Sequence, residues 1–120
     1  MAAAYLDMSW HTLKDTEKRE ANTFEKAAMD KLKLIDEIIP RYRSPYFAHI
    51  FSGGYSSGYY SYLWSEVLDA DAFQAFKETG DIFDRQTARK YRKMLSMGGS
   101  LPGMELYKTF RGKEPEIQPL

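Results

Sequence analysis

Residues 47–64 read FAHIFSGGYSSGYYSYLW and bring one histidine, three glycines and four tyrosines into one short segment. Glycine adopts backbone conformations closed to other residues and lets a ligand approach the main chain closely. Phenol and imidazole groups are neutral hydrogen-bond donors suited to a polarised carbonyl or an oxyanion. The segment therefore predicts a mobile loop that holds a substrate. The alternative is a packing loop whose hydroxyls bond to nearby backbone.

The composition limits the class of protein. With 120 residues and 13.9 kDa the chain is one domain at most, or part of one. Lys plus Arg and Asp plus Glu are both 17, and this balance argues against a nucleic-acid partner, which would need a basic surplus. No apolar run approaches the roughly 20 residues of a membrane helix, so we expect no membrane partner. The alanines after Met1 lack the basic region of a signal peptide.

The chain contains no cysteine, which excludes disulfides, thiolate zinc sites and cysteine nucleophiles. This absence fits a reducing compartment, and we expect a cytoplasmic protein.

The pattern of apolar residues predicts an all-α fold. In the second expected helix, Asn22 or Thr23 is the N-cap and Pro40 is the stop. Between the second and third helices we expect irregular chain with a short extended piece over 46–51. Gly80 is expected to end the third helix, while Asp84 and Ser100 cap the last two. The expected helices span 2–13, 23–39, 57–76, 84–97 and 100–110.

Two helix faces can be assigned from spacing. In the first helix, Tyr5, Met8 and Leu13 fall roughly on one side. On an ideal helix over 55–66, four residues fall within about 40° of one another, because they are spaced i, i+4, i+7 and i+11. These residues are Tyr55, Tyr59, Tyr62 and Glu66. The residues expected to point elsewhere, as core contacts, are Tyr60, Leu63, Trp64 and Val67.

The run FAHIFSGGYSSGYYSYLWSEVLDADAF, followed by GG at 98–99, ELYKTF at 105–110 and RGKEP at 111–115, closely resembles the C-terminal end of the M3 family of zinc metallopeptidases. Within the family it is most similar to the peptidyl-dipeptidase and oligopeptidase A branch. The resemblance covers about residues 2–120. It implies a C-terminal helical lobe of a larger, mostly helical metallopeptidase with a Gly/Tyr-rich loop. The intact enzyme would hydrolyse short peptides, and would release dipeptides if the branch is right.

The resemblance also implies a site. In the family this loop closes over bound peptide, and its histidine and tyrosines bond the substrate backbone and the oxygen of the tetrahedral intermediate. The implied catalytic residues are Tyr62 and His49. The implied substrate-binding residues are Tyr55, Tyr59, Gly53 and Gly54.

The M3 zinc site requires His-Glu-x-x-His on a helix, with two imidazoles at i and i+4. This chain has only His11 and His49, and neither forms such a pair. We therefore expect residues 1–120 to be a single C-terminal fragment that lacks the zinc-binding helix. We expect zinc to be bound in the intact enzyme and not by this fragment. The fragment would be inactive without the missing N-terminal part.

Two other readings remain open at this point. The first is a free-standing helical module that binds peptides or a partner protein through its Gly/Tyr loop. The second is a helical scaffold with no ligand, which leaves that loop unexplained. His11 is expected to be a hydrogen-bonded packing residue rather than a ligand. Arg41 and Arg43 are either surface residues or partners for a peptide carboxylate.

Overall fold

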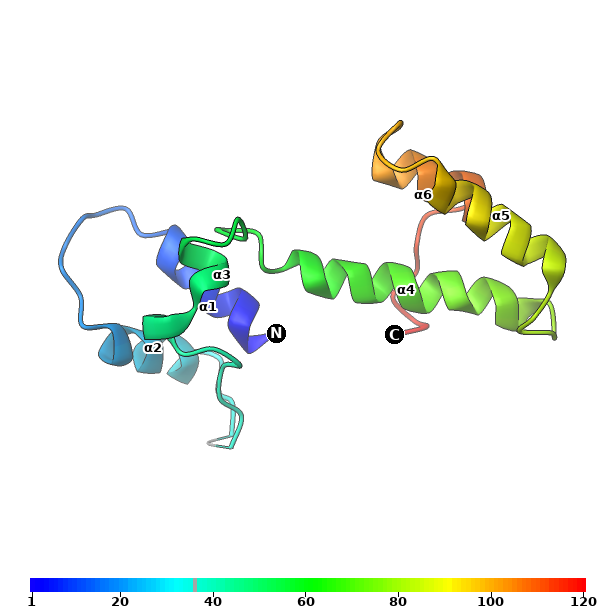
Figure 1. The fold of residues 1–120 in the computed structure, drawn as a ribbon. Helices are drawn as coiled ribbons and strands as arrows, with labels where there is room; N and C mark the ends of the chain where they lie inside the picture. Colours follow the sequence, from blue (N-terminus) through cyan, green and yellow to red (C-terminus); the bar gives the residue numbers. More distant parts are fainter. Residues whose placement is uncertain (36) are drawn as a thin grey trace. The chain divides into compact units, whose positions relative to one another are not determined.

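The computed structural model describes residues 1–35 and 37–120, and within them the chain is all-helical, with no strand. This confirms the all-α prediction. The chain divides into two compact units, an N-terminal unit of residues 1–63 and a C-terminal unit of residues 64–120. The elements, labelled in Figure 1, are α1 (Ala2–His11), α2 (Ala21–Asp30), the 3-10 helix η1 (Ser44–Tyr46), α3 (Ala48–Phe51), α4 (Ser61–Glu78), α5 (Arg85–Ser96) and α6 (Gly103–Arg111).

Helix α1 does not bury the side on which Tyr5 and Met8 fall. Tyr5 and Met8 are exposed, whereas Leu6 and Asp7 are fully buried. Leu13 lies beyond the last residue of the helix, His11. Leu6 joins a core with Ala28, Phe47 and Ile50, so this core draws on α1, α2 and the segment around α3. The buried side also carries the Asp7 carboxylate, whose hydrogen bonds are made within the protein.

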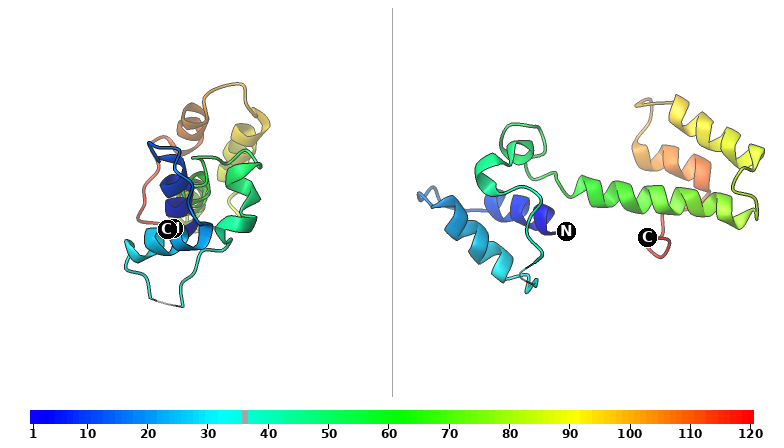
Figure 2. Two further views of the ribbon diagram at one scale, coloured as in Figure 1. Left: turned by 90° about the vertical axis from the view of Figure 1, so that its left-hand side faces the viewer. Right: turned by 60° about the horizontal axis from the view of Figure 1, so that its bottom comes forward.

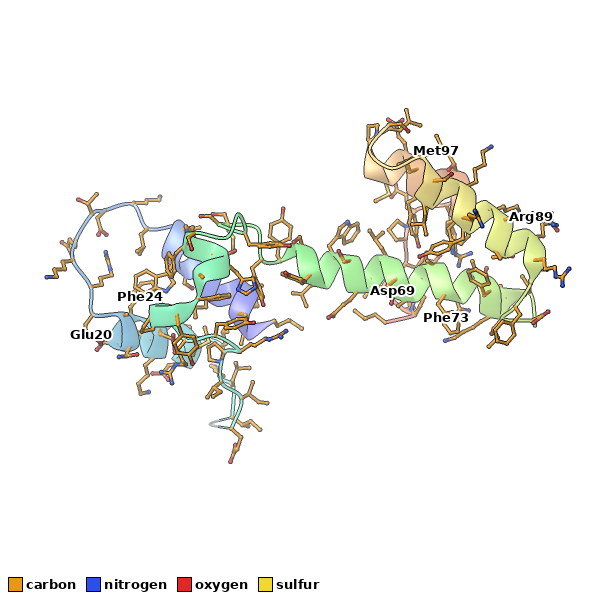
Figure 3. All side chains as sticks on the ribbon, viewed as in Figure 1. Glu20, Phe24, Asp69, Phe73, Arg89 and Met97 are labelled. Atoms are coloured by element: carbon orange, nitrogen blue, oxygen red, sulfur yellow. The ribbon has the colours of Figure 1, made fainter. Side chains whose placement is uncertain are left out.

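Helix α2 begins earlier and ends sooner than predicted. Its N-cap is Glu20, labelled in Figure 3, whose carboxylate accepts from the backbone N–H groups of Asn22 and Thr23 at 3.0 and 2.6 Å. The expected caps were wrong because a glutamate fills this role. The helix ends at Asp30 rather than near Ile39.

The chain after α2 does not continue as a helix. Lys33 has a positive φ of 51°, which a helix interior does not allow. The apolar side chains that were expected to extend α2 are exposed, so no packing supports a longer helix there. Those side chains are Leu34, Ile35, Ile38 and Ile39. Asp36, which the expected helix included, lies outside the described residues.

The expected extended piece over 46–51 is also wrong. Pro45 lies in the first turn of η1, where its missing N–H costs little, and α3 follows directly. Phe47 and Ile50 are almost fully buried in this stretch, at 1% and 0% exposure. The single turn of α3 is therefore fixed by tertiary packing rather than by its own propensity.

The later helices agree better with expectation. Helix α4 ends at Glu78, two residues before Gly80, which has a φ of 77°. Asp84 caps α5 as predicted, accepting from the Thr87 N–H at 2.6 Å. Helix α6 begins at Gly103 with Pro102 as its N-cap, so the cap predicted at Ser100 was wrong by two residues.

The C-terminal unit has its own core, in which α5 and α6 lie side by side (Figure 2). Ala72 of α4 packs with Tyr107 and Phe110 of α6, and Tyr91 of α5 lies against them. None of the helices in the described part of the chain is long and apolar enough to cross a membrane.

Candidate functional site

His49 and three predicted tyrosines lie together in the N-terminal unit. The ring centroid of His49 lies 6.1 Å from each of Tyr55 and Tyr59. Tyr62 lies 5.1 Å from Tyr55 and 4.8 Å from Tyr59. We call these four residues the His/Tyr cluster. The structure thus brings all the predicted catalytic and substrate-binding side chains into one place.

A helical face does not build this cluster, contrary to the prediction. Helix α4 begins only at Ser61, so Tyr55 and Tyr59 lie in the connection from α3. That connection is bent by local hydrogen bonds: the Tyr55 N–H donates to the His49 carbonyl at 2.9 Å, and the Gly58 N–H to the Tyr55 carbonyl at 2.8 Å. The bent connection therefore places Tyr55 and Tyr59 near Tyr62, as the expected helical face would have done.

The backbone around the two adjacent glycines, Gly53 and Gly54, requires residues without a side chain. Gly54 has a φ of 82°, in the left-handed region that side-chain-bearing residues rarely adopt. A Cβ on Gly53 would lie 2.8 Å from the Cα of His49 and 3.1 Å from the Ala48 carbonyl oxygen. Gly53 therefore lets the chain turn back tightly against the residue that carries the imidazole.

Tyr62 is the most open member of the cluster, with 43% of its surface exposed. A side-chain hydrogen bond with Tyr55, aided by desolvation, raises the pKa of Tyr62 above its ordinary value of 10.0. The phenol therefore stays protonated at neutral pH and remains a neutral donor.

The side chains that were expected to point away from the tyrosine face and into the core are only partly buried. Val67 is buried, but Tyr60 is 57% exposed and Trp64 45% exposed, so the expectation that they are core contacts was wrong. Tyr60 precedes α4, which begins at Ser61, so the expected helical spacing does not apply to it.

Sequence reasoning missed two neighbours of the cluster. Tyr42 has its ring 4.8 Å from that of His49. Asp7 is fully buried and accepts hydrogen bonds from the Ser57 and Tyr59 N–H groups, both at 2.9 Å. One signal was available for Asp7, since its spacing of i, i+4 to His11 on α1 pairs a carboxylate with an imidazole.

His11 behaves as the hydrogen-bonded packing residue that was expected. Its Nδ1 lies 2.8 Å from Oδ1 of Asp7 and 2.8 Å from the Asp7 carbonyl oxygen. Its ring also packs 5.7 Å from that of Phe51.

The two arginines ahead of the cluster have partners within the N-terminal unit. The Arg43 Nε donates to the buried carboxylate of Glu25, which also accepts from the Ser44 N–H at 2.6 Å. The Arg41 guanidinium lies over the ring of Tyr42, 5.4 Å from its centroid. Arg43 is thus held as part of the fold.

The described residues form no group that resembles a zinc centre. Over residues 1–35 and 37–120, no three His, Cys, Asp or Glu side chains are grouped to hold a metal ion.

An apolar pocket of about 640 Å³ in the C-terminal unit, lined in part by Leu68, Tyr91 and Leu106, contains none of the predicted site residues.

The sequence of the chain can be compared with those of known proteins. The model of peptidase family M3 matches residues 1–120, which is the whole chain. The chain belongs to peptidase family M3. This confirms the family resemblance found in the sequence.

Curated M3 relatives extend well beyond the matched region. The chain is 43% identical over 122 residues to dipeptidyl carboxypeptidase of Escherichia coli, a match that covers 100% of this chain and 18% of that protein. It is 56% identical over 72 residues to oligopeptidase A of the same organism, covering 59% of this chain and 10% of the relative. A probable cytosolic oligopeptidase A of Arabidopsis thaliana is 47% identical over 78 residues. The chain thus spans about a fifth or less of the relatives it matches.

Proposed function

We propose that this chain is the substrate-loop portion of a zinc-dependent M3 peptidase that hydrolyses short peptides. The observation that carries the proposal is the His/Tyr cluster, in which His49 and three phenols converge within the N-terminal unit. The names of the relatives, dipeptidyl carboxypeptidase and oligopeptidase A, support peptides as substrates. They also support the release of dipeptides as one mode of action.

The cluster supplies neutral hydrogen-bond donors. Tyr62 and His49 would donate to the carbonyl oxygen of the scissile bond as negative charge develops on it, which typically contributes about 2.7–4 kcal/mol per donor. Tyr55 and Tyr59 would bind the substrate backbone, while Gly53 and Gly54 let the main chain turn close to it. The raised pKa of Tyr62 suits this role because the proton to be donated stays on the oxygen.

In this proposal, the chain needs the zinc-binding part of a longer peptidase in order to hydrolyse peptides. When bound, zinc would supply Lewis-acid chemistry, and in this proposal its ligands lie in the remainder of a longer peptidase. The 120 residues alone are therefore expected to be inactive, and metal-dependent cleavage of a peptide by the purified chain would contradict this. The absence of cysteine and the Arabidopsis relative named as probably cytosolic support a cytoplasmic enzyme.

The decisive experiment is the Tyr62→Phe substitution in the natural full-length protein. Removing one oxyanion donor should lower kcat about 10²–10³-fold with a much smaller change in KM, because the bond strengthens only in the transition state. Steady-state kinetics on a short quenched-fluorescent peptide measure both constants. The matched control is Tyr60→Phe, since Tyr60 is an exposed neighbour outside the cluster. Equal activity of the two variants would overturn the catalytic role of Tyr62.

The free-standing binding module is the competing function. Similarity to a peptidase along 100% of the chain favours the hydrolytic proposal over it. Binding of the same peptide by the full-length protein without any turnover would reverse that preference.

A further inference from the structure

We propose that Asp7 is a positioning residue for the His/Tyr cluster: its buried carboxylate anchors the backbone of Ser57 and Tyr59 and so sets where the phenols lie. The inference rests on the function proposed for that cluster. Asp7 touches neither substrate nor zinc in this proposal and acts only through the loop.

The anchor joins segments that are far apart in the sequence. Oδ1 of Asp7 accepts from the Ser57 N–H and Oδ2 accepts from the Tyr59 N–H, each at 2.9 Å and across 50 and 52 residues of chain. Asp7 is fully buried, so water does not compete for these oxygens. A carboxylate that accepts two amides inside a protein is held strongly, because charge-assisted bonds are shorter and stronger than neutral ones.

The loop has a conformation that needs such an anchor. Ser57 has a φ of 54°, in the left-handed region that residues with a side chain rarely adopt. Strained backbone persists only where its surroundings hold it. The Ser57 and Tyr59 N–H groups converge on the Asp7 carboxylate, while the Gly58 N–H between them donates to the Tyr55 carbonyl. Without Asp7, residues 57–59 lose the contact that ties their turn to α1.

His11 completes the anchor. Its Nδ1 lies 2.8 Å from the same Oδ1 that accepts from Ser57. Asp7 therefore has a partner on its own helix as well as on the loop, and this partner limits the rotation of the carboxylate about its side-chain bonds.

The anchor bears on catalysis because one of the two anchored amides belongs to a cluster residue. The Tyr59 ring lies 4.8 Å from that of Tyr62 and 6.1 Å from that of His49. A shift of the Tyr59 backbone therefore moves the phenol that packs against both proposed catalytic side chains. Misplacement of a catalytic group by about 1 Å can cost about 10²-fold in rate.

The test is Asp7→Asn in the natural full-length protein. Asparagine keeps the size of the side chain but offers one oxygen, and it turns an NH₂ group toward the second loop amide. Hydrogen exchange followed by mass spectrometry should show faster exchange in peptides covering 55–62, with unchanged exchange over 21–30. On the quenched-fluorescent peptide, kcat should fall about 10–100-fold with less than a threefold change in KM.

The matched control is Asp15→Asn, which makes the same change of charge on a half-exposed aspartate paired with Arg19. It should leave both the loop exchange and kcat unchanged. Unchanged exchange over 55–62 in Asp7→Asn would overturn the proposal, and so would faster exchange with an unaltered kcat in an enzyme that Tyr62→Phe inactivates.

If exchange over 21–30 is also faster, Asp7→Asn has unfolded the whole N-terminal unit. A second variant then tests the proposal. His11→Phe removes only the Nδ1 partner and keeps a ring against Phe51. A selective rise in exchange over 55–62, with a several-fold loss in kcat, supports the anchor, and no rise overturns it.

The result also separates this inference from the proposed function. If Asp7→Asn frees the loop while Tyr62→Phe stays fully active, the anchor stands and the catalytic role of the cluster falls. If the loop exchange is unchanged while Tyr62→Phe is inactive, only the role of Asp7 falls.

Discussion

Asp71 is fully buried on α4, and two side chains of α6 hold its carboxylate. The Tyr107 hydroxyl donates to Oδ2 at 2.6 Å, and the Arg111 Nε lies 3.2 Å from the same oxygen. The guanidinium of Arg111 also makes two 2.7 Å hydrogen bonds to Glu78. This network joins the two helices in the C-terminal unit, much as Asp7 joins α1 to the loop in the N-terminal unit.

The network makes the stability of this unit depend on pH. Burial favours the neutral form of Asp71, but the hydrogen bonds from Tyr107 and Arg111 outweigh it and hold the pKa of Asp71 below its ordinary 3.8. The hydrogen bonds from Arg111 likewise lower the pKa of Glu78 below 4.5. A carboxyl whose folded pKa is depressed stabilises the protein above its unfolded pKa, and this stability is lost as the pH falls through the folded pKa.

We therefore expect the free energy of unfolding to fall as the pH drops from about 5 to below about 3.8. Asp71→Asn should be less stable at pH 7 by about 1–3 kcal/mol, since a charge-assisted bond is lost, and its stability should depend less on pH. Urea unfolding at a series of pH values measures both effects. Asp69→Asn on the exposed side of the same helix is the control and should retain the wild-type slope. Parallel pH profiles for Asp71→Asn and the wild type would contradict the prediction.

At the scale of helices, local chemistry made the end of α4 and the start of α5 predictable, because Gly80 and Asp84 act on their own neighbours in sequence. Helix α3 was not predictable in the same way, since a single turn is stable only through the burial of Phe47 and Ile50. The His/Tyr cluster was predicted from the residues that form it. Its scaffold was not, because the Ser57 and Tyr59 N–H groups donate to Asp7, which is distant in sequence.

The connection after α3 gives a prediction for Gly53. A methyl group at Gly53 would lie 2.8 Å from the Cα of His49. The methyl carbon is bonded to the backbone and the Cα is part of it, so neither can move away at low cost. Gly53→Ala should therefore lower the free energy of unfolding by about 1–3 kcal/mol, as overpacking usually does, and displace His49. Thermal unfolding and peptide kinetics on the full-length protein would record both. In the control, Gly99→Ala, the added Cβ meets no atom within 4 Å. Wild-type stability and kcat in Gly53→Ala would show that the turn can relax.

For the whole molecule, the match to peptidase family M3 follows the chain from end to end, and the segment between α2 and η1 exposes several large apolar side chains. Between α2 and η1 four large apolar side chains lie within six positions, with Ile35 and Ile39 exposed at 66% and 64%. Apolar patches of this kind mark contact surfaces or sites of aggregation. We expect the remainder of the longer peptidase of our proposal to cover this segment.

The 120-residue chain on its own is therefore expected to self-associate through the segment around Ile35 and Ile39. Replacing both isoleucines with lysine removes apolar area and adds like charges, so the double variant should shift toward the monomer at concentrations where the wild type forms larger species. Sedimentation velocity over a range of concentrations measures the shift. Ile117→Lys is the control, because Ile117 is just as exposed, at 68%, but lies in the C-terminal tail. If Ile117→Lys disperses the chain and the double variant does not, the association surface lies elsewhere and the segment before η1 has no part in it.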